Sequence, residues 1–132
     1  NQHGDTIIEV LITVSIVIAT LTSAYMLSSR GAQTMQNASE QTQALKLAER
    51  QIELLRTHST LPGPGGCYDA TGAVASTPGD CIVDSSGTPK DISYTGARYT
   101  IGVTKPSDVY IITVTWDRIG GGKGNVTLYY VR

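Results

Sequence analysis

Apolar residues are unevenly distributed along this chain, and the longest uninterrupted apolar run lies near its start. From Val10 to Ser29 the sequence carries no charge and is mostly apolar, reading VLITVSIVIATLTSAYMLSS. Between Asp5 and Thr57 the sequence contains no proline and a single glycine, Gly31. Because glycine lowers helix stability, we expect the helix to bend at Gly31 in an assembled state. The pattern predicts one helix over 5–57, about 80 Å long.

The two halves of this predicted helix differ in their apolar pattern. The first half, 5–30, is apolar on every side, so we expect it to lie in lipid or among other helices. Its apolar run is long enough to span a bilayer before Arg30 ends it. In 31–57, apolar residues recur at steps of three and four, which predicts one stripe facing a core. The stripe consists of Ala38, Leu45, Ala48, Ile52 and Leu55. The polar residues expected on a surface facing solvent or other subunits include Gln41, Gln43, Lys46, Glu49, Arg50 and Glu53.

Turn-forming residues follow the helix. The sequence LPGPGG at 61–66 ends the helical region, and 58–91 is a loop region with a short strand piece expected around Ile82 and Val83. In 92–132 we expect an antiparallel sheet. Alternating apolar residues predict its strands, at Ala97–Thr104, Val109–Asp117 and Asn125–Arg132. The sheet needs a cover, and the helical stripe supplies it. The predicted fold class is therefore α+β, one long N-terminal helix packed against three or four antiparallel strands.

A single acid, Glu9, stands directly before the apolar run. An isolated charge in apolar surroundings costs roughly 3 kcal/mol or more, so we expect a partner for it. Thr6-Ile7-Ile8-Glu9 matches the capping box S/T-x-x-E, in which the acid pairs with the backbone of its own helix. Alternatively, cutting the chain after Gly4 would free an amine on Asp5, which could pair with Glu9 of a neighbouring copy.

Gly4, Asp5, Glu9 and the apolar run together resemble the N-terminal region of the type IV pilin family, including the pseudopilins. In that family a short leader ends in Gly, the mature chain carries Glu at its fifth position, and apolar residues follow. The resemblance implies that a prepilin peptidase cuts after Gly4 and methylates the amine of Asp5. Residues 1–4 would then be a leader remnant, and because the chain begins without Met we expect more leader upstream.

The resemblance also implies a function and a fold, the pilin-like packing of a long helix on a small sheet. The chain would be a structural subunit of a type IV pilus, held in the membrane as a precursor and then polymerised into a helical surface filament for adhesion, motility or DNA uptake. Its partners would be copies of itself, the membrane, prepilin peptidase, the pilus assembly machinery, and host or partner-cell surfaces. Asp5 and Glu9 would direct subunit assembly. The expected filament-core residues are Ile7, Ile8, Val10, Leu11, Ile12, Val14, Ile16, Val17, Ile18 and Leu21.

Two alternatives remain open. A pseudopilin or minor pilin of a secretion or DNA-uptake machine would share all of these residues. A membrane-anchored extracellular binding module would share the apolar helix, but it would have no use for Glu9 at the start of the helix.

The two cysteines, Cys67 and Cys81, lie between turn signals in the loop region. In an exported protein a disulfide is favoured over free thiols. The bridge would close a loop of about 15 residues, stabilise the fold by roughly 3 kcal/mol, and pin the loop region.

Nothing in the sequence predicts an enzyme, a cofactor or a metal site. The net charge of −1 gives no general attraction to nucleic acid, and we expect no specific nucleic-acid site. Gly120–Gly124 with Lys123 lacks the Ser or Thr of a phosphate-binding loop and is expected to be a hairpin turn. His3 and His58 are isolated, and no nucleophile, base and orienting group occur together. The seven tyrosines are expected mainly to pack within the sheet.

Overall fold

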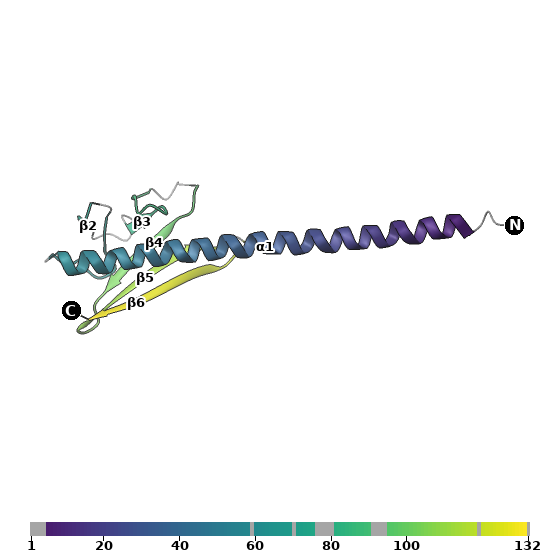
Figure 1. Ribbon diagram of the computed structural model, residues 1–132. Coiled ribbons are helices and arrows are strands. Elements are labelled where there is room, and N and C mark those ends of the chain that lie inside the picture. Colours follow the sequence, from purple (N-terminus) through teal and green to yellow (C-terminus); the bar gives the residue numbers. More distant parts are fainter. Residues whose placement is uncertain are drawn as a thin grey trace. The chain divides into compact units, whose positions relative to one another are not determined.

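A computed structural model describes residues 5–58, 60–69, 71–75, 81–90, 95–118 and 120–131, and Figure 1 shows it as a ribbon. The elements in chain order are α1 (Asp5–Thr57), β1 (Cys67–Tyr68), β2 (Val74–Ala75), β3 (Ile82–Val83), β4 (Tyr99–Thr104), β5 (Val109–Asp117) and β6 (Lys123–Val131). The predicted α+β class is confirmed, because one long N-terminal helix packs against a small antiparallel sheet of four strands.

The chain divides into two compact units, Asn1–Gln36 and Asn37–Arg132. In the first unit, every described residue belongs to α1. The helix runs over the predicted 5–57 and stays regular through Gly31. No atom beyond the helix's own neighbouring backbone lies within 4 Å of the place where a Cβ on Gly31 would sit. Nothing in the surroundings therefore requires a glycine there.

The second unit contains the sheet, in the order β3-β4-β5-β6 with every neighbouring pair antiparallel. The predicted antiparallel arrangement of the three strands and the short strand at Ile82 and Val83 are confirmed, and β5 has the predicted bounds. β4 begins at Tyr99, two residues later than predicted. β6 begins at Lys123, two residues earlier than predicted, because Lys123 pairs with Asp117 across the hairpin. The glycine-rich turn is correspondingly tighter than expected. A separate two-stranded sheet joins β1 to β2.

The core of the second unit lies between the sheet and residues 37–57 of α1. Alternate residues of β4 and β5 point into it, as the apolar alternation in the sequence of these strands predicts. They are Tyr99, Ile101, Val103, Tyr110, Ile112, Val114 and Trp116. The third inward row, on β6, is only partly buried, and it consists of Val126, Leu128 and Tyr130.

The predicted helical stripe was partly wrong. Ala48 and Leu55 are buried as expected, but Leu45 is 39% exposed and Ala38 is also exposed. The side chains of α1 that are buried on the core face are Ala44, Leu47, Ala48, Gln51 and Leu55. These positions follow the helical repeat, but one of them is polar. The prediction considered only apolar residues. It therefore left out the buried Gln51 and placed the exposed Ala38 and Leu45 on the core face.

Candidate functional site

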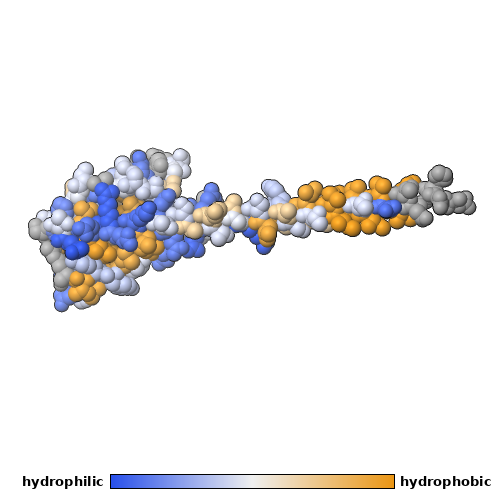
Figure 2. All heavy atoms as spheres, viewed as in Figure 1, coloured by the Kyte–Doolittle hydropathy of each residue, from blue (hydrophilic) through white to orange (hydrophobic). Residues whose placement is uncertain are grey.

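The apolar surface of the first unit is its most distinctive feature. All the residues predicted to form a filament core are exposed in the single chain, at 64% for Ile7 and 65% for Leu21. The space-filling view in Figure 2 shows this stretch of helix as a largely apolar surface. The mean hydropathy reaches 2.2 over an 18-residue window, so the helix is long and apolar enough to cross a membrane. An apolar helix surface exposed on every side is expected to be covered by lipid or by other helices.

Hydroxyl side chains within the apolar run are satisfied by the helix itself. Each donates a hydrogen bond to a carbonyl one turn earlier, at 2.7–2.9 Å, as in Ser15 to Leu11. The five donors are Thr13, Ser15, Thr20, Thr22 and Ser23. Because these donors already have acceptors, the helix can enter an apolar environment without leaving them unpaired.

Glu9 is exposed, and within the described part of the chain no hydrogen bond or ion pair holds its carboxylate. The capping-box alternative requires Thr6 to precede the helix, but α1 already includes Asp5 and Thr6. The backbone therefore gives Thr6 no capping position. The proposed cut after Gly4, the leader remnant 1–4 and His3 lie outside the described residues, as does the side chain of Asp5.

Two glutamines of α1 form hydrogen bonds that connect the helix to the loop region and to the sheet of the second unit. The carboxamide of Gln51, which is 3% exposed, donates to Tyr68 O at 2.8 Å and accepts from Tyr68 N at 2.9 Å. Gln43, expected on an outer surface, is instead half-buried and accepts a hydrogen bond from the hydroxyl of Tyr99 at 2.8 Å. Burial, and secondarily the charge of Glu40, raises the pKa of Tyr99. These polar contacts join residues that are distant in sequence, and the apolar pattern gave no sign of them.

The predicted disulfide is confirmed. Cys67 and Cys81 are bonded, with their Cα atoms 5.8 Å apart, and both residues are fully buried. The bridge joins β1 to the residue directly before β3. It therefore pins the loop region at the places where its two hairpins begin.

These two hairpins repeat one turn that the sequence reasoning missed. Asp69 Oδ1 accepts hydrogen bonds from the amides of Thr71 and Ala73 and from the Thr71 hydroxyl. Asp84 Oδ1 accepts the equivalent three bonds, from the amides of Ser86 and Thr88 and the hydroxyl of Ser86. The signal was present in the sequence as a repeated Asp-x-Ser/Thr-Gly, in DATG and DSSG.

Both turns end in a glycine, Gly87 against α1 and Gly72 against the last turn of α1 and His58, the residue that follows it. Gly72 and Gly87 have φ values of 85° and 82°, a conformation that favours glycine. A Cβ on Gly72 would lie 2.9 Å from Nε2 of His58, and one on Gly87 would lie 2.9 Å from a guanidinium nitrogen of Arg50. The repeated turn thus brings the loop backbone close to the helix at two places.

The hydrogen bonds in these turns lower the pKa values of the two aspartates that accept them. The hydroxyl of Ser86, helped by the amides of Thr88 and Ser86 and by Lys90, lowers the pKa of Asp84 to about 2. The Thr71 hydroxyl and neighbouring amides likewise lower the pKa of Asp69. Lys90 Nζ lies 3.3 Å from Asp84 Oδ2. Both carboxylates are therefore held in their charged form as structural acceptors.

Among the described residues, no group of three or more His, Cys, Asp or Glu side chains is placed to hold a metal ion. His58 lies beside the ring of Tyr68, with ring centroids 5.6 Å apart. Lys123 begins a strand and does not open a helix. The glycines before it, Gly120, Gly121 and Gly122, all have positive φ, as the tight hairpin turn requires.

No protein-family model, curated protein or solved structure matches this chain. The pilin resemblance therefore rests on the N-terminal residues themselves, and what it implies about function is a proposal.

Proposed function

We propose that this protein is a structural subunit of a helical surface filament of the type IV pilus kind. The observation that carries the proposal is the position of Glu9, an acid without a partner in the described chain, near the start of a helix whose apolar side chains are exposed. Both features are costly in an isolated protein. Assembly of many copies through their helices removes both costs together.

Assembly begins with a precursor whose segment Val10–Ser29 lies in the bilayer. Cleavage after Gly4 frees the amine of Asp5, which the peptidase methylates without removing its positive charge. As subunits leave the membrane, the apolar helices pack against one another, and Glu9 of one copy pairs with the Asp5 amine of another. In a dry core this pair specifies the register between subunits, because a charge without its partner is strongly penalised. Contacts that repeat without closing produce a helical filament.

The second unit has the properties expected of the exposed part of such a filament. It has its own core, a buried disulfide between Cys67 and Cys81, and turns stabilised by charged acceptors. A disulfide favours an oxidising compartment, which supports placement outside the cell. Adhesion, motility and DNA uptake could each use such a surface.

A membrane-anchored binding module is the second candidate, because a helix of this length and hydropathy could serve as a simple anchor. The two proposals differ in what they require of Glu9. An anchor only has to span the bilayer, so loss of the carboxylate should leave it in place. A filament subunit needs the carboxylate to enter the polymer.

Electron microscopy of material sheared from cells tests the proposal. Cells should produce the wild type, Glu9→Ala or the matched control Glu49→Ala at equal levels of precursor, since Glu49 is also an exposed acid on α1. We expect thin filaments that contain the subunit from the wild type and the control, and few or none from Glu9→Ala. Equal filaments from all three would remove the assigned role of Glu9. Membrane-bound protein without filaments from any of them would favour the anchor.

A further inference from the structure

The tripeptide Asn-x-Ser/Thr, the acceptor sequence for N-linked glycans, occurs twice in this chain. The first copy begins at Asn37, on α1, and the second begins at Asn125, on β6. The sequence alone gives neither copy a preference. The structure separates them, because the same spacing has opposite consequences on a helix and on a strand.

The copy on α1 does not present its two side chains together. Residues two apart on a helix lie about 200° apart around the axis, so Asn37 and Ser39 point in nearly opposite directions. Asn37 is half-buried, and Oδ1 of its carboxamide is buried without a hydrogen-bond partner among the described residues. Ser39 is exposed. An enzyme that must contact both side chains therefore cannot do so on the folded helix.

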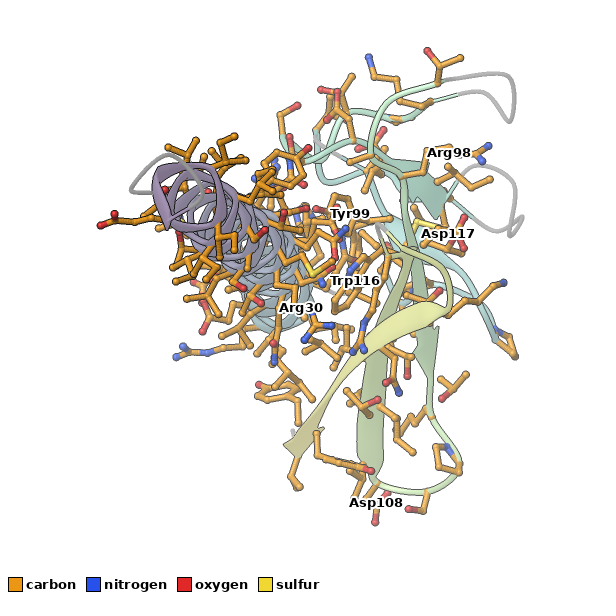
Figure 3. The ribbon with its side chains drawn as sticks, turned by 90° about the vertical axis from the view of Figure 1, so that its right-hand side faces the viewer. Arg30, Arg98, Tyr99, Asp108, Trp116 and Asp117 are labelled. Carbon is orange, nitrogen blue, oxygen red and sulfur yellow. A yellow bond between two sulfur atoms is a disulfide. The ribbon has the colours of Figure 1, made fainter. Side chains whose placement is uncertain are left out.

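The copy on β6 presents its two side chains on one face. Residues two apart on a strand point the same way, so the carboxamide of Asn125 and the hydroxyl of Thr127 lie side by side. Figure 3 shows that Trp116 points toward the helix and that Asp117 points away from it. The alternation along β5 places Thr115 on the same side as Asp117, and Asn125 is the cross-strand partner of Thr115. The acceptor pair thus lies on the outer face of the sheet, where Asn125 is exposed and Thr127 is half-buried.

The outer edge of β6 is open to an approaching enzyme. β6 is the last strand in the order of its sheet, and β5 is its only strand neighbour among the described residues. A glycosyltransferase can therefore bind the backbone of 125–127 from this edge without unfolding the sheet. The same outer face carries Tyr129 and Val131, which are 70% and 66% exposed. Free edges with exposed apolar side chains tend to pair with other chains, and native proteins normally protect them.

We propose that Asn125 carries an N-linked glycan and that Asn37 does not. The donor is a saccharide held on a lipid phosphate. The carboxamide nitrogen of Asn125 forms a bond to the anomeric carbon of the first sugar, while the bond from that carbon to the phosphate oxygen breaks. The lipid phosphate leaves, and one proton passes from the nitrogen to a base of the transferase, which recognises the acceptor through the hydroxyl of Thr127.

The attached saccharide stands beside the free edge of β6 and hinders other strands from pairing with it. The inference requires only that the second unit is exported. A filament subunit and a membrane-anchored module share this requirement, so the inference holds or fails independently of filament assembly.

Trypsin separates the two copies for the test. It cuts after lysine and arginine, so it releases 124–132 as one peptide and 31–46 as another, each with a single acceptor sequence. The full chain is purified from the cells that naturally produce it, digested, and analysed by mass spectrometry with electron-transfer fragmentation. We expect a saccharide mass on Asn125 in peptide 124–132, and no added saccharide on peptide 31–46.

Four variants make the test discriminating. Asn125→Gln removes the acceptor, and Thr127→Val removes the recognised hydroxyl but keeps the shape of the side chain, so each should abolish the modification. Thr127→Ser keeps a hydroxyl and should retain it. Ser39→Ala is the matched control, because it removes the hydroxyl of the other copy and should leave the glycan in place. Formation of the disulfide between Cys67 and Cys81 in each variant checks that it folded and was exported.

An unmodified 124–132 peptide from the wild type would overturn the proposal, as would a saccharide on peptide 31–46. A saccharide that persists in Asn125→Gln would show attachment to the hydroxyl of Thr127 and would equally overturn it.

Discussion

The carboxamide of Gln51 forms hydrogen bonds with both backbone polar groups of Tyr68, donating to the carbonyl at 2.8 Å and accepting from the amide at 2.9 Å. In this way a helical side chain acts like a neighbouring strand. Tyr68 is 1% exposed, and its hydroxyl donates to the carbonyl of Thr60 at 2.6 Å. A single residue pair therefore ties the first hairpin of the loop region to the core side of α1.

Replacing Gln51 should destabilise the second unit markedly. Gln51→Ala removes both hydrogen bonds that this side chain makes with the buried backbone of Tyr68, at a cost of roughly 2–4 kcal/mol in the free energy of unfolding. Gln41→Ala, which removes an exposed glutamine from the same helix, should cost less than about 0.5 kcal/mol. Urea denaturation of the full chain in detergent, followed by near-ultraviolet circular dichroism, measures both. Equal midpoints for the two variants would contradict the assigned role of Gln51.

The disulfide should contribute to stability through the length of the loop it closes. Cys67 and Cys81 are 14 residues apart, so their bridge is expected to stabilise the fold by about 3 kcal/mol. A Cys67→Ser, Cys81→Ser double variant should lower the urea midpoint accordingly, and a reducing agent should do the same to the wild type but leave the variant unchanged. A wild type that is insensitive to complete reduction, verified by thiol labelling, would refute this expectation.

Acid should weaken the fold through the two turn aspartates. The folded pKa of Asp84 is about 2, below its ordinary value of 3.8, so its contribution is full above pH 4 and falls as the pH drops toward 2. Asp84→Asn should remove this part of the pH dependence, while Asp108→Asn, in the exposed turn between β4 and β5, should leave it. Melting temperatures between pH 2 and pH 6 provide the measurement. A wild-type curve as flat as that of Asp84→Asn would show that the turn does not stabilise the fold electrostatically.

Gly124 should be intolerant of any side chain. It pairs with Trp116, and a Cβ there would collide with the indole ring. Gly124→Ala should cost roughly 1–3 kcal/mol and shift the tryptophan fluorescence, because Trp116 must move. Gly102→Ala is the matched control, since it lies in β4 with no atom within 4 Å of its Cβ position. Unchanged fluorescence and stability in Gly124→Ala would mean that the indole does not cover this glycine.

The sequence predicted those elements whose patterns run without interruption. The long helix and β5 match their predicted bounds, because no Pro breaks the first and strict alternation marks the second. Which side of α1 packs against the core was less predictable. Gln51 and Gln43 lie on that side because they form hydrogen bonds with the backbone of Tyr68 and the hydroxyl of Tyr99. Such contacts depend on tertiary structure, and polar residues carry no apolar signal.

The candidate sites show the same difference between features that the sequence pattern marks and features that depend on tertiary structure. The cysteine pair was predictable from composition and context, whereas the repeated turns were missed because each hairpin has strands of only two residues or a single bridge. The partner proposed for Glu9 belongs to another copy, so under that proposal a single chain does not contain it.

Cryo-electron microscopy of the sheared filaments is the most direct test of the central claim. The reconstruction should place the apolar helices of many copies in the filament core, with the Glu9 carboxylate of one copy beside the free amine of Asp5 on another. A reconstruction with the sheet units in the core, with Glu9 facing solvent, or with a chain that still begins before Asp5 would contradict the account.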